Sequence, residues 1–201
     1  RPHEIFTDRR NSKGFDFSDA ENLKNLNSEF EDFSSIKFVA KSILADDLDL
    51  KELPKEMYCP GNNKKTIGTT MFATNGVVAH LQNNMPSKQW QDISLDIKKE
   101  IFQRVAEQLH QNQSKLFYLL ATEAGKTLKD ADAEVREAID FVNYYVCEGE
   151  RVFLPCKLTG PTGENNYLSH EAKGNFLCIS PWNFPLAIFV GQITAALLAG
   201  N

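Results

Sequence analysis

The sequence lacks an excess of basic charge and a long uninterrupted apolar run. Its 22 Lys and Arg against 27 Asp and Glu give a net charge of −5, which argues against a nucleic-acid partner because phosphate backbones attract basic surfaces. The most apolar segment, residues 186–199, is interrupted by Gln192 and Thr194 and is shorter than the roughly 20 residues that cross a bilayer. We therefore expect no membrane span. The chain also opens at Arg1 without a basic-then-apolar signal segment, so nothing in it indicates secretion.

Closely spaced metal or redox ligands are also missing. The four cysteines are Cys59, Cys147, Cys156 and Cys178. No two of them have the spacing of a zinc site or a redox motif, and the histidines show no metal-ligand spacing either. We expect free thiols, no metal site, and a reducing cytoplasmic compartment.

The composition is that of a folded protein. Hydrophobic residues make up 42% and charged residues 24%, and 201 residues can bury a core without disulfides or metals. The chain stops directly after the apolar run Ala195-Ala-Leu-Leu-Ala-Gly-Asn201, and such a segment needs a partner to cover it. We interpret the sequence as a piece of a longer protein, with the remainder of its own chain as partner. We expect the isolated piece to self-associate through residues 186–199.

The first part of the chain has few turn signals of its own. Gly14 is the only glycine among the first 60 residues, and residues 1–35 mix charged residues with Asn and Ser. This pattern predicts a connector with a short helix at residues 19–30. Two strands follow, at residues 36–44 and 66–72, with a turn at 60–63.

Helical periodicity dominates the centre. One apolar stripe is formed by Ile97, Ile101, Val105 and Leu109. A second helix at residues 116–124 ends at Gly125, and Thr127 with Asp130 resembles a capping box that opens a long helix to about residue 149. The buried stripe predicted for that long helix is Val135, Ile139, Val142 and Val146.

The last residues predict a strand, a turn and a helix. Residues 174–201 contain no charge, and the pattern indicates a strand at 175–180, a turn at 181–185 and a buried helix at 186–199. A further strand is expected at residues 166–170. With the central helices, this arrangement indicates an α/β fold.

Asn183 occupies the place where such folds bind ligands, between the carboxyl end of a strand and the start of a helix. Its amide can donate a hydrogen bond, and the helix N-terminus adds positive potential, so Asn183 could stabilise an oxyanion. The alternative is that Asn183 only caps the helix, with Pro185 in the first turn. The residues by themselves favour the cap.

Longer motifs resemble a known family. The run Lys173-Gly-Asn-Phe-Leu-Cys-Ile-Ser-Pro-Trp-Asn-Phe-Pro-Leu186, with Ala195-Ala-Leu-Leu-Ala-Gly-Asn201, is similar to the aldehyde dehydrogenase superfamily, and Glu123-Ala-Gly-Lys-Thr127 fits the helices before it. Gly160-Pro-Thr-Gly-Glu164 and Arg9-Arg-Asn-Ser-Lys-Gly-Phe-Asp16 more narrowly resemble the pyrroline-5-carboxylate (glutamate semialdehyde) dehydrogenase part of the bifunctional proline utilization A proteins.

This resemblance implies the N-terminal part of an aldehyde-dehydrogenase-type NAD-binding domain at residues 36–201. Residues 1–35 would be the connector from a proline dehydrogenase domain, whose FAD lies outside this chain. The implied reaction is NAD-dependent oxidation of a small-molecule aldehyde, glutamate semialdehyde, through a cysteine thiohemiacetal in proline catabolism. The implied enzyme is cytoplasmic, with peripheral association of the parent at the inner membrane as an option.

The resemblance also implies roles for single residues. Asn183 would hold the oxyanion, and Phe184 and Glu137 would face the substrate. The dinucleotide site would be lined by Ile179, Ser180, Pro181 and Trp182. The ordinary alternative for Glu137 is a solvated helix carboxylate.

Three catalytic parts of the family have no match here: the nucleophilic cysteine, the general-base glutamate and the lysine at the cofactor ribose. Cys178 is no substitute, because we expect it to be buried within an apolar strand and poorly reactive. We therefore expect the 201-residue piece alone to be inactive. Two alternatives remain open: a non-catalytic helical interaction module, and part of an aldehyde dehydrogenase with another substrate.

Overall fold

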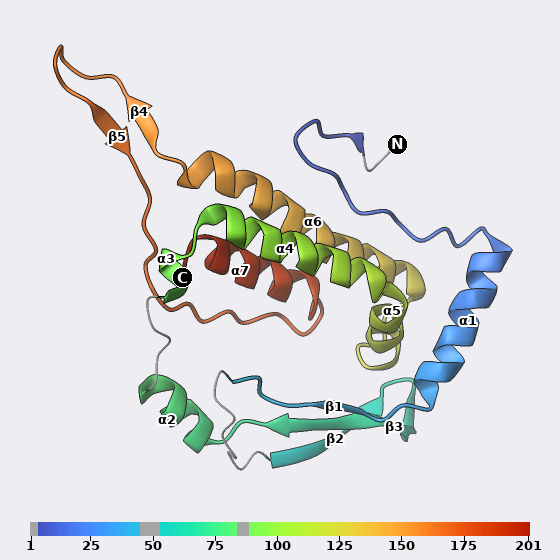
Figure 1. The fold of residues 1–201 in the computed structure, drawn as a ribbon. Coiled ribbons are helices and arrows are strands. Elements are labelled where there is room, and N and C mark those ends of the chain that lie inside the picture. Colours follow the sequence, from blue (N-terminus) through green and yellow to red (C-terminus); the bar gives the residue numbers. More distant parts are fainter. Residues whose placement is uncertain (1–3, 45–52, 84–88) are drawn as a thin grey trace. The chain divides into compact units, whose positions relative to one another are not determined.

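The computed structural model describes residues 4–44, 53–83 and 89–201. Helices and strands are both present, as the sequence predicts for an α/β protein. The helices are α1 (Ala20–Ser34), α2 (Asn75–Asn83), α3 (Gln89–Asp92), α4 (Leu95–Gln111), α5 (Gln113–Thr122), α6 (Leu128–Phe153) and α7 (Ala187–Leu198) (Figure 1). The strands are β1 (Phe38–Ala40), β2 (Leu53–Cys59), β3 (Asn62–Phe72), β4 (Cys156–Leu158) and β5 (Asn166–Leu168).

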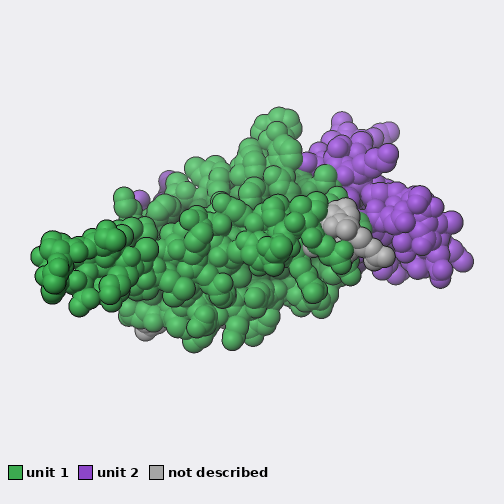
Figure 2. All heavy atoms as spheres, turned by 90° about the horizontal axis from the view of Figure 1, so that it is seen from above, with its two compact units in different colours: residues 1–14, 87–112, 133–201 green, residues 15–86, 113–132 purple. Residues whose placement is uncertain are grey.

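The chain divides into two compact units, coloured separately in Figure 2. The first unit comprises residues 1–14, 87–112 and 133–201, and the second comprises residues 15–86 and 113–132. Neither unit boundary falls at residue 35, where the sequence predicts the connector to end. The division into connector and dehydrogenase part therefore stays a prediction.

The second unit contains a three-stranded sheet, the helices α1, α2 and α5, and the first residues of α6. Its strand order is β1-β3-β2, with β1 parallel and β2 antiparallel to β3. Strands β1 and β3 approach closely at Gly68, where a side chain would collide with the backbone of Phe38. The core centres on Phe117 and Tyr118 of α5, which are 0% and 4% exposed. The rings around Tyr118 are Phe30, Phe33 and Phe38.

Local capping explains where two helices begin. The Asp19 carboxylate accepts hydrogen bonds from the backbone N–H groups of Glu21 and Asn22 at the start of α1. Thr127 Oγ1 accepts from the backbone N–H of Asp130, 3.2 Å away, as the predicted capping box requires. Between α5 and α6, Gly125 adopts a φ of 69°, the left-handed conformation expected of a glycine after a helix.

Three helices, α4, α6 and α7, lie side by side in the first unit (Figure 1). The predicted stripe of α6 is confirmed, because Val135, Ile139, Val142 and Val146 are all buried. Helix α6 continues four residues beyond the predicted end at residue 149 and reaches Phe153. The antiparallel β4–β5 hairpin follows it.

The N-terminal residues of the first unit run along α6. The Asp140 carboxylate accepts hydrogen bonds from both the backbone N–H and the hydroxyl of Ser12. Asn143 donates from its side-chain amide to the backbone carbonyl of Arg10, 3.1 Å away. These contacts fix the predicted connector segment to the helix that carries Glu134 and Glu137.

The prediction of a β-strand at residues 175–180 is wrong, because these residues are not paired in a sheet of the described part of the chain. The segment is extended but pairs with no strand among the described residues. Its exposure alternates, since Leu177 and Ile179 are 86% and 71% exposed while Cys178 and Ser180 are half-buried. A β-strand is defined by the hydrogen bonds of a neighbouring strand, and sequence pattern cannot supply that neighbour. Cys178 is therefore half-buried rather than part of the core.

Candidate active-site turn

The turn at residues 181–185 joins the extended segment to α7. Its backbone is closed by a hydrogen bond from the N–H of Phe184 to the carbonyl of Pro181, 3.3 Å apart. Two prolines, Pro181 and Pro185, fix their own φ angles and stiffen the turn further. The side chains between them face outward: Trp182 is 88% exposed, and Asn183 is exposed as well.

The N-terminus of α7 is capped by a residue from another helix. The side chain of the N-cap residue, Leu186, has no oxygen and makes no capping hydrogen bond. Instead, Oε1 of Glu134 on α6 accepts from the backbone N–H of Leu186 at 2.8 Å and of Ala187 at 3.3 Å. The structure therefore excludes the interpretation of Asn183 as the cap.

The same contact changes the electrostatics expected at the turn. A helix N-terminus carries partial positive charge, which by itself would assist Asn183. The carboxylate of Glu134 lies directly on that N-terminus and is only 1% exposed. Its negative charge offsets the helix dipole, so the positive potential expected beside Asn183 is reduced.

Two side-chain amides hold the extended segment along α7. Gln192 Nε2 donates to the carbonyl oxygen of Ile179 at 3.2 Å. Oδ1 of Asn201 accepts from the backbone N–H groups of Lys173 and Gly174. The segment that enters the turn is thus fixed at both of its ends. A pocket of about 610 Å³ is lined by Cys178 of this segment and by Ala195 of α7.

The predicted dinucleotide residues are consecutive and largely accessible. Ile179 and Trp182 are exposed, whereas Ser180 and Pro181 between them are half-buried. Phe184, at 37% exposure, directly follows Asn183 on the same turn. The chain itself therefore brings these residues together.

Glu137 lies on α6, 46 positions before Asn183 in sequence, and is half-buried. It follows Glu134 by three residues and precedes Phe141 by four, so the three share one side of the helix. Both neighbours contact α7: Glu134 caps it, and the ring of Phe141 packs against Gly191. This side of α6 is therefore partly used for packing, with Glu137 between two residues that touch α7.

Sequence reasoning missed Glu134. Its position carried a signal, because it belongs to the apolar stripe of α6, three residues after Ala131 and four before Ala138, both fully buried. A carboxylate at such a position needs hydrogen-bond donors. The identity of those donors depends on the fold, and only the structure shows that they belong to α7.

The thiols occupy different environments. All four cysteines are free, Cys156 is exposed, and the other three are half-buried. Burial raises the pKa of the Cys147 thiol, and its 3.3 Å hydrogen bond to the Asp8 carboxylate raises it further. A raised pKa reduces the thiolate fraction, which disfavours nucleophilic chemistry at Cys147. Among the described residues, no three His, Cys, Asp or Glu side chains are grouped so as to hold a metal.

Comparison with known proteins decides the family. The model of the aldehyde dehydrogenase family matches residues 51–201. The chain belongs to the aldehyde dehydrogenase family. The resemblance drawn from the turn motif is thereby confirmed.

No helix in the described ranges is long and apolar enough to span a bilayer.

Relatives within the family include PutA proteins and 1-pyrroline-5-carboxylate dehydrogenases. The bifunctional protein PutA of Salmonella typhimurium is 34% identical over 203 residues, which cover 100% of this chain and 14% of that protein. A 1-pyrroline-5-carboxylate dehydrogenase of Anoxybacillus flavithermus is 28% identical over 204 residues, 99% of this chain and 38% of that protein. This aldehyde dehydrogenase chain thus spans a minor share of each relative's length. The PutA match includes residues 1–50, which the family model leaves out.

A solved structure shows the same fold. The crystal structure of the 1-pyrroline-5-carboxylate dehydrogenase from Thermus with bound NAD has a TM-score of 0.87 and 24% identity. The match covers 98% of this chain and 39% of that one. Residues 1–201 therefore have the fold of the N-terminal part of an aldehyde dehydrogenase.

Proposed function

We propose that residues 1–201 belong to an NAD-dependent dehydrogenase that oxidises glutamate semialdehyde, the open form of pyrroline-5-carboxylate, to glutamate. The names of the relatives support this substrate. The reaction removes a hydride from the aldehyde carbon and adds oxygen from water. When bound, NAD supplies the hydride acceptor, and the presence of NAD in the Thermus enzyme supports this choice of cofactor.

The observation that supports the proposal is the environment of the Asn183 side chain. Its amide is exposed, it is not the helix cap, and it lies on a turn closed by a backbone hydrogen bond and flanked by two prolines. A donor held in a fixed position stabilises developing charge without reorganisation during the reaction. Asn183 would donate to the aldehyde oxygen as that oxygen becomes negative.

Residues 179–182 fit one wall of a dinucleotide site. Ile179 and Trp182 offer exposed apolar surface, and no charged residue from 174 onward would repel the pyrophosphate. Phe184 would contact the aliphatic part of the substrate, and Glu137 would orient its amino group. The carboxylate of Glu137 would pair with this amino group, which a simple aldehyde lacks.

The remaining catalytic groups would come from outside residues 1–201. Burial raises the pKa of the Cys147 thiol, which disfavours Cys147 as the nucleophile, and Cys178 is half-buried. The proposal therefore places the nucleophile, the general base and the ribose-binding lysine in the longer protein. It also places the enzyme in the cytoplasm, and any FAD in a separate proline dehydrogenase domain preceding residues 1–35.

The test uses the full-length protein that contains residues 1–201. Asn183→Ala should lower kcat for glutamate semialdehyde on the order of 10²–10³, as removal of other oxyanion donors does. Asn175→Ala is the matched control, because Asn175 is exposed in the same uncharged segment. A loss of thermal stability with unchanged kcat in Asn183→Ala would refute the oxyanion role.

A second measurement concerns the 201-residue chain alone. With NAD and glutamate semialdehyde at high protein concentration, it should produce no NADH, because covalent catalysis needs a nucleophile and a base. Sustained NADH formation that survives Cys178→Ser would contradict the placement of the nucleophile outside this chain.

A further inference from the structure

Glu134 is a buried carboxylate with a defined structural contact and no role in the reaction described so far. It is 1% exposed, and its Oε1 accepts from two successive backbone N–H groups, those of Leu186 and Ala187. Burying a carboxylate is unfavourable unless hydrogen bonds and opposite charge compensate, and the N-terminus of α7 supplies both. The contact therefore joins the position of α6 to the first residues of α7.

Only two residues separate this contact from Asn183. Pro185 limits the φ freedom between Leu186 and the turn, and the hydrogen bond from Phe184 to Pro181 closes the turn on the other side. Little backbone freedom is left between the anchor and the amide of Asn183. A shift of Leu186 would therefore be transmitted to Asn183.

We propose that Glu134 is a positioning residue that sets the location of the Asn183 amide relative to the substrate. This inference rests on the function proposed for Asn183. A misplacement of about 1 Å in a catalytic group can lower the rate on the order of 100-fold. The length of the Glu134 side chain, rather than its charge, is what places the turn.

Two conservative substitutions separate length from charge. Glu134→Gln keeps the chain length and an Oε1 that accepts the two N–H groups, but removes the charge. Glu134→Asp keeps the charge and shortens the side chain by one methylene. In the full-length enzyme, Glu134→Gln should retain kcat within a few-fold, whereas Glu134→Asp should lower kcat by about 10- to 100-fold. The KM for NAD should stay unchanged in both.

A double-mutant cycle distinguishes positioning from a general loss of structure. Because Glu134 acts through Asn183, Glu134→Asp should lower kcat no further once Asn183 is replaced by Ala. A residue that only supports the fold would lower kcat equally in both backgrounds. Thermal unfolding of every variant, measured beside kcat, shows how far each change alters stability.

The outcomes are distinct. Three results together support the inference. The kcat falls in Glu134→Asp but is retained in Glu134→Gln. In the Asn183→Ala background, Glu134→Asp does not lower kcat further. Equal kcat in Glu134→Asp and the wild type overturns it, as does a larger loss in Glu134→Gln or an undiminished effect in the Asn183→Ala background. If Asn183→Ala itself leaves kcat unchanged, the proposed function fails and this inference fails with it. A loss in Asn183→Ala without any in Glu134→Asp refutes the inference alone.

Discussion

The ring of Phe141 on α6 lies so close to Gly191 on α7 that a side chain at this position would require the ring to shift. A Cβ atom built on Gly191 would come within 3.0 Å of Cδ2 and 3.1 Å of Cγ of Phe141. Phe141 is itself backed by Tyr145, whose ring stacks with it at 6.2 Å between centroids. This close approach packs α7 against α6 about two turns along α6, and about one turn along α7, from the contact made by Glu134.

Gly191→Ala should therefore destabilise the protein. Alanine normally stabilises a helix interior relative to glycine by about 0.8–1 kcal/mol, but overpacking a core position costs about 1–3 kcal/mol. With Tyr145 behind it, the Phe141 ring has little room to move, so we expect a net loss. Urea unfolding of the 201-residue chain, followed by circular dichroism, measures it.

Gly149→Ala is the matched control. Gly149 also lies inside a helix, and a Cβ there would meet Leu95 Cδ1 at 3.6 Å, an ordinary contact. This variant should gain up to about 1 kcal/mol in free energy of unfolding from helix propensity. Stabilisation by Gly191→Ala equal to that of Gly149→Ala would show that the Phe141 ring moves aside without cost.

The helices are predictable because their signals are local. Asp19, Thr127 and Gly125 mark ends within a few residues of the elements they bound, and the stripe of α6 repeats at helical spacing. The strand expected at residues 175–180 depends on something different. Its apolar run is present, but strand pairing needs a partner segment that sequence pattern cannot identify.

The candidate site likewise has one part that local sequence predicts and one part that depends on the fold. The turn at residues 181–185 is contiguous, so its motif alone groups Asn183 with its neighbours. Glu134 lies 52 positions before Leu186. Periodicity places it on the apolar face of α6, but only the packing of α7 shows which groups satisfy it. For this reason the residues by themselves favour the cap for Asn183, an interpretation that the structure shows to be wrong.

Asp8→Asn should make Cys147 more reactive. Burial is the larger cause of the raised pKa of Cys147, and the hydrogen bond and charge of Asp8 add to it. An asparagine removes the charge, so the thiol pKa should fall and the thiolate fraction at about pH 8 should rise. Alkylation of Cys147 by iodoacetamide should become several-fold faster, as measured by mass spectrometry of tryptic peptides.

Cys156 provides an internal control for this experiment. It is exposed, and trypsin cleavage after Arg151 places it in a different peptide from Cys147. Its alkylation rate should be the same in wild type and Asp8→Asn. Slower alkylation of Cys147 in the variant would show that the Asp8 contact does not disfavour the thiolate.

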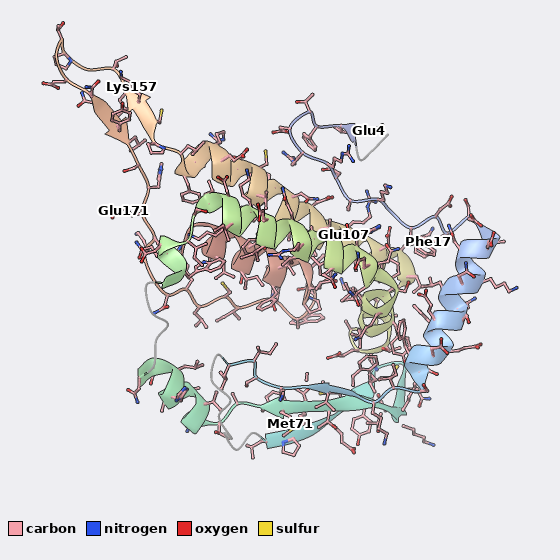
Figure 3. The ribbon with its side chains drawn as sticks, viewed as in Figure 1. Glu4, Phe17, Met71, Glu107, Lys157 and Glu171 are labelled. Carbon is pink, nitrogen blue, oxygen red and sulfur yellow. The ribbon has the colours of Figure 1, made fainter. Side chains whose placement is uncertain are left out.

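Lys98 should make stability depend on pH in the alkaline range. It is 5% exposed, and its Nζ donates to the carbonyl of Gln91 at 3.3 Å. Lys98 lines a pocket of about 250 Å³ together with Asp92 and with Glu171, which Figure 3 labels. Burial lowers the pKa of Lys98 in the folded state, although the charge of Asp92 opposes part of the shift. Between the folded-state pKa and the ordinary value, the unfolded chain holds a proton that the folded chain has lost.

The contribution of Lys98 to the free energy of unfolding therefore increases with pH between its folded-state pKa and its ordinary pKa, because the unfolded state binds more protons in this range. The free energy of unfolding of the wild type minus that of Lys98→Met should increase from neutral pH toward about pH 10. Urea titrations at several pH values measure this difference. Lys157→Met is the matched control, because it replaces an exposed lysine on the β4–β5 hairpin (Figure 3). A difference that decreases with pH for Lys98→Met would contradict the assigned direction.

The substrate role proposed for Glu137 competes with an ordinary alternative, because a half-buried carboxylate on a helix is often only a solvated surface group. Its neighbours argue for a role: Glu134 three residues before it and Phe141 four residues after it both contact α7, which begins directly beyond the Asn183 turn. A carboxylate there can pair with the amino group of glutamate semialdehyde. A simple aldehyde has no group for it to bind.

In the full-length enzyme, Glu137→Ala should therefore lower kcat/KM for glutamate semialdehyde by about tenfold or more, since a hydrogen bond to a charged group contributes about 1.5–3 kcal/mol. Propionaldehyde oxidation should change little. Glu148→Ala is the matched control, because Glu148 lies on the same helix in a surface pair with Arg151, and such pairs contribute little. Equal losses with both aldehydes would assign Glu137 to folding rather than to substrate recognition. A selective loss for the semialdehyde would extend the substrate site from the turn onto α6, the helix that also carries Glu134.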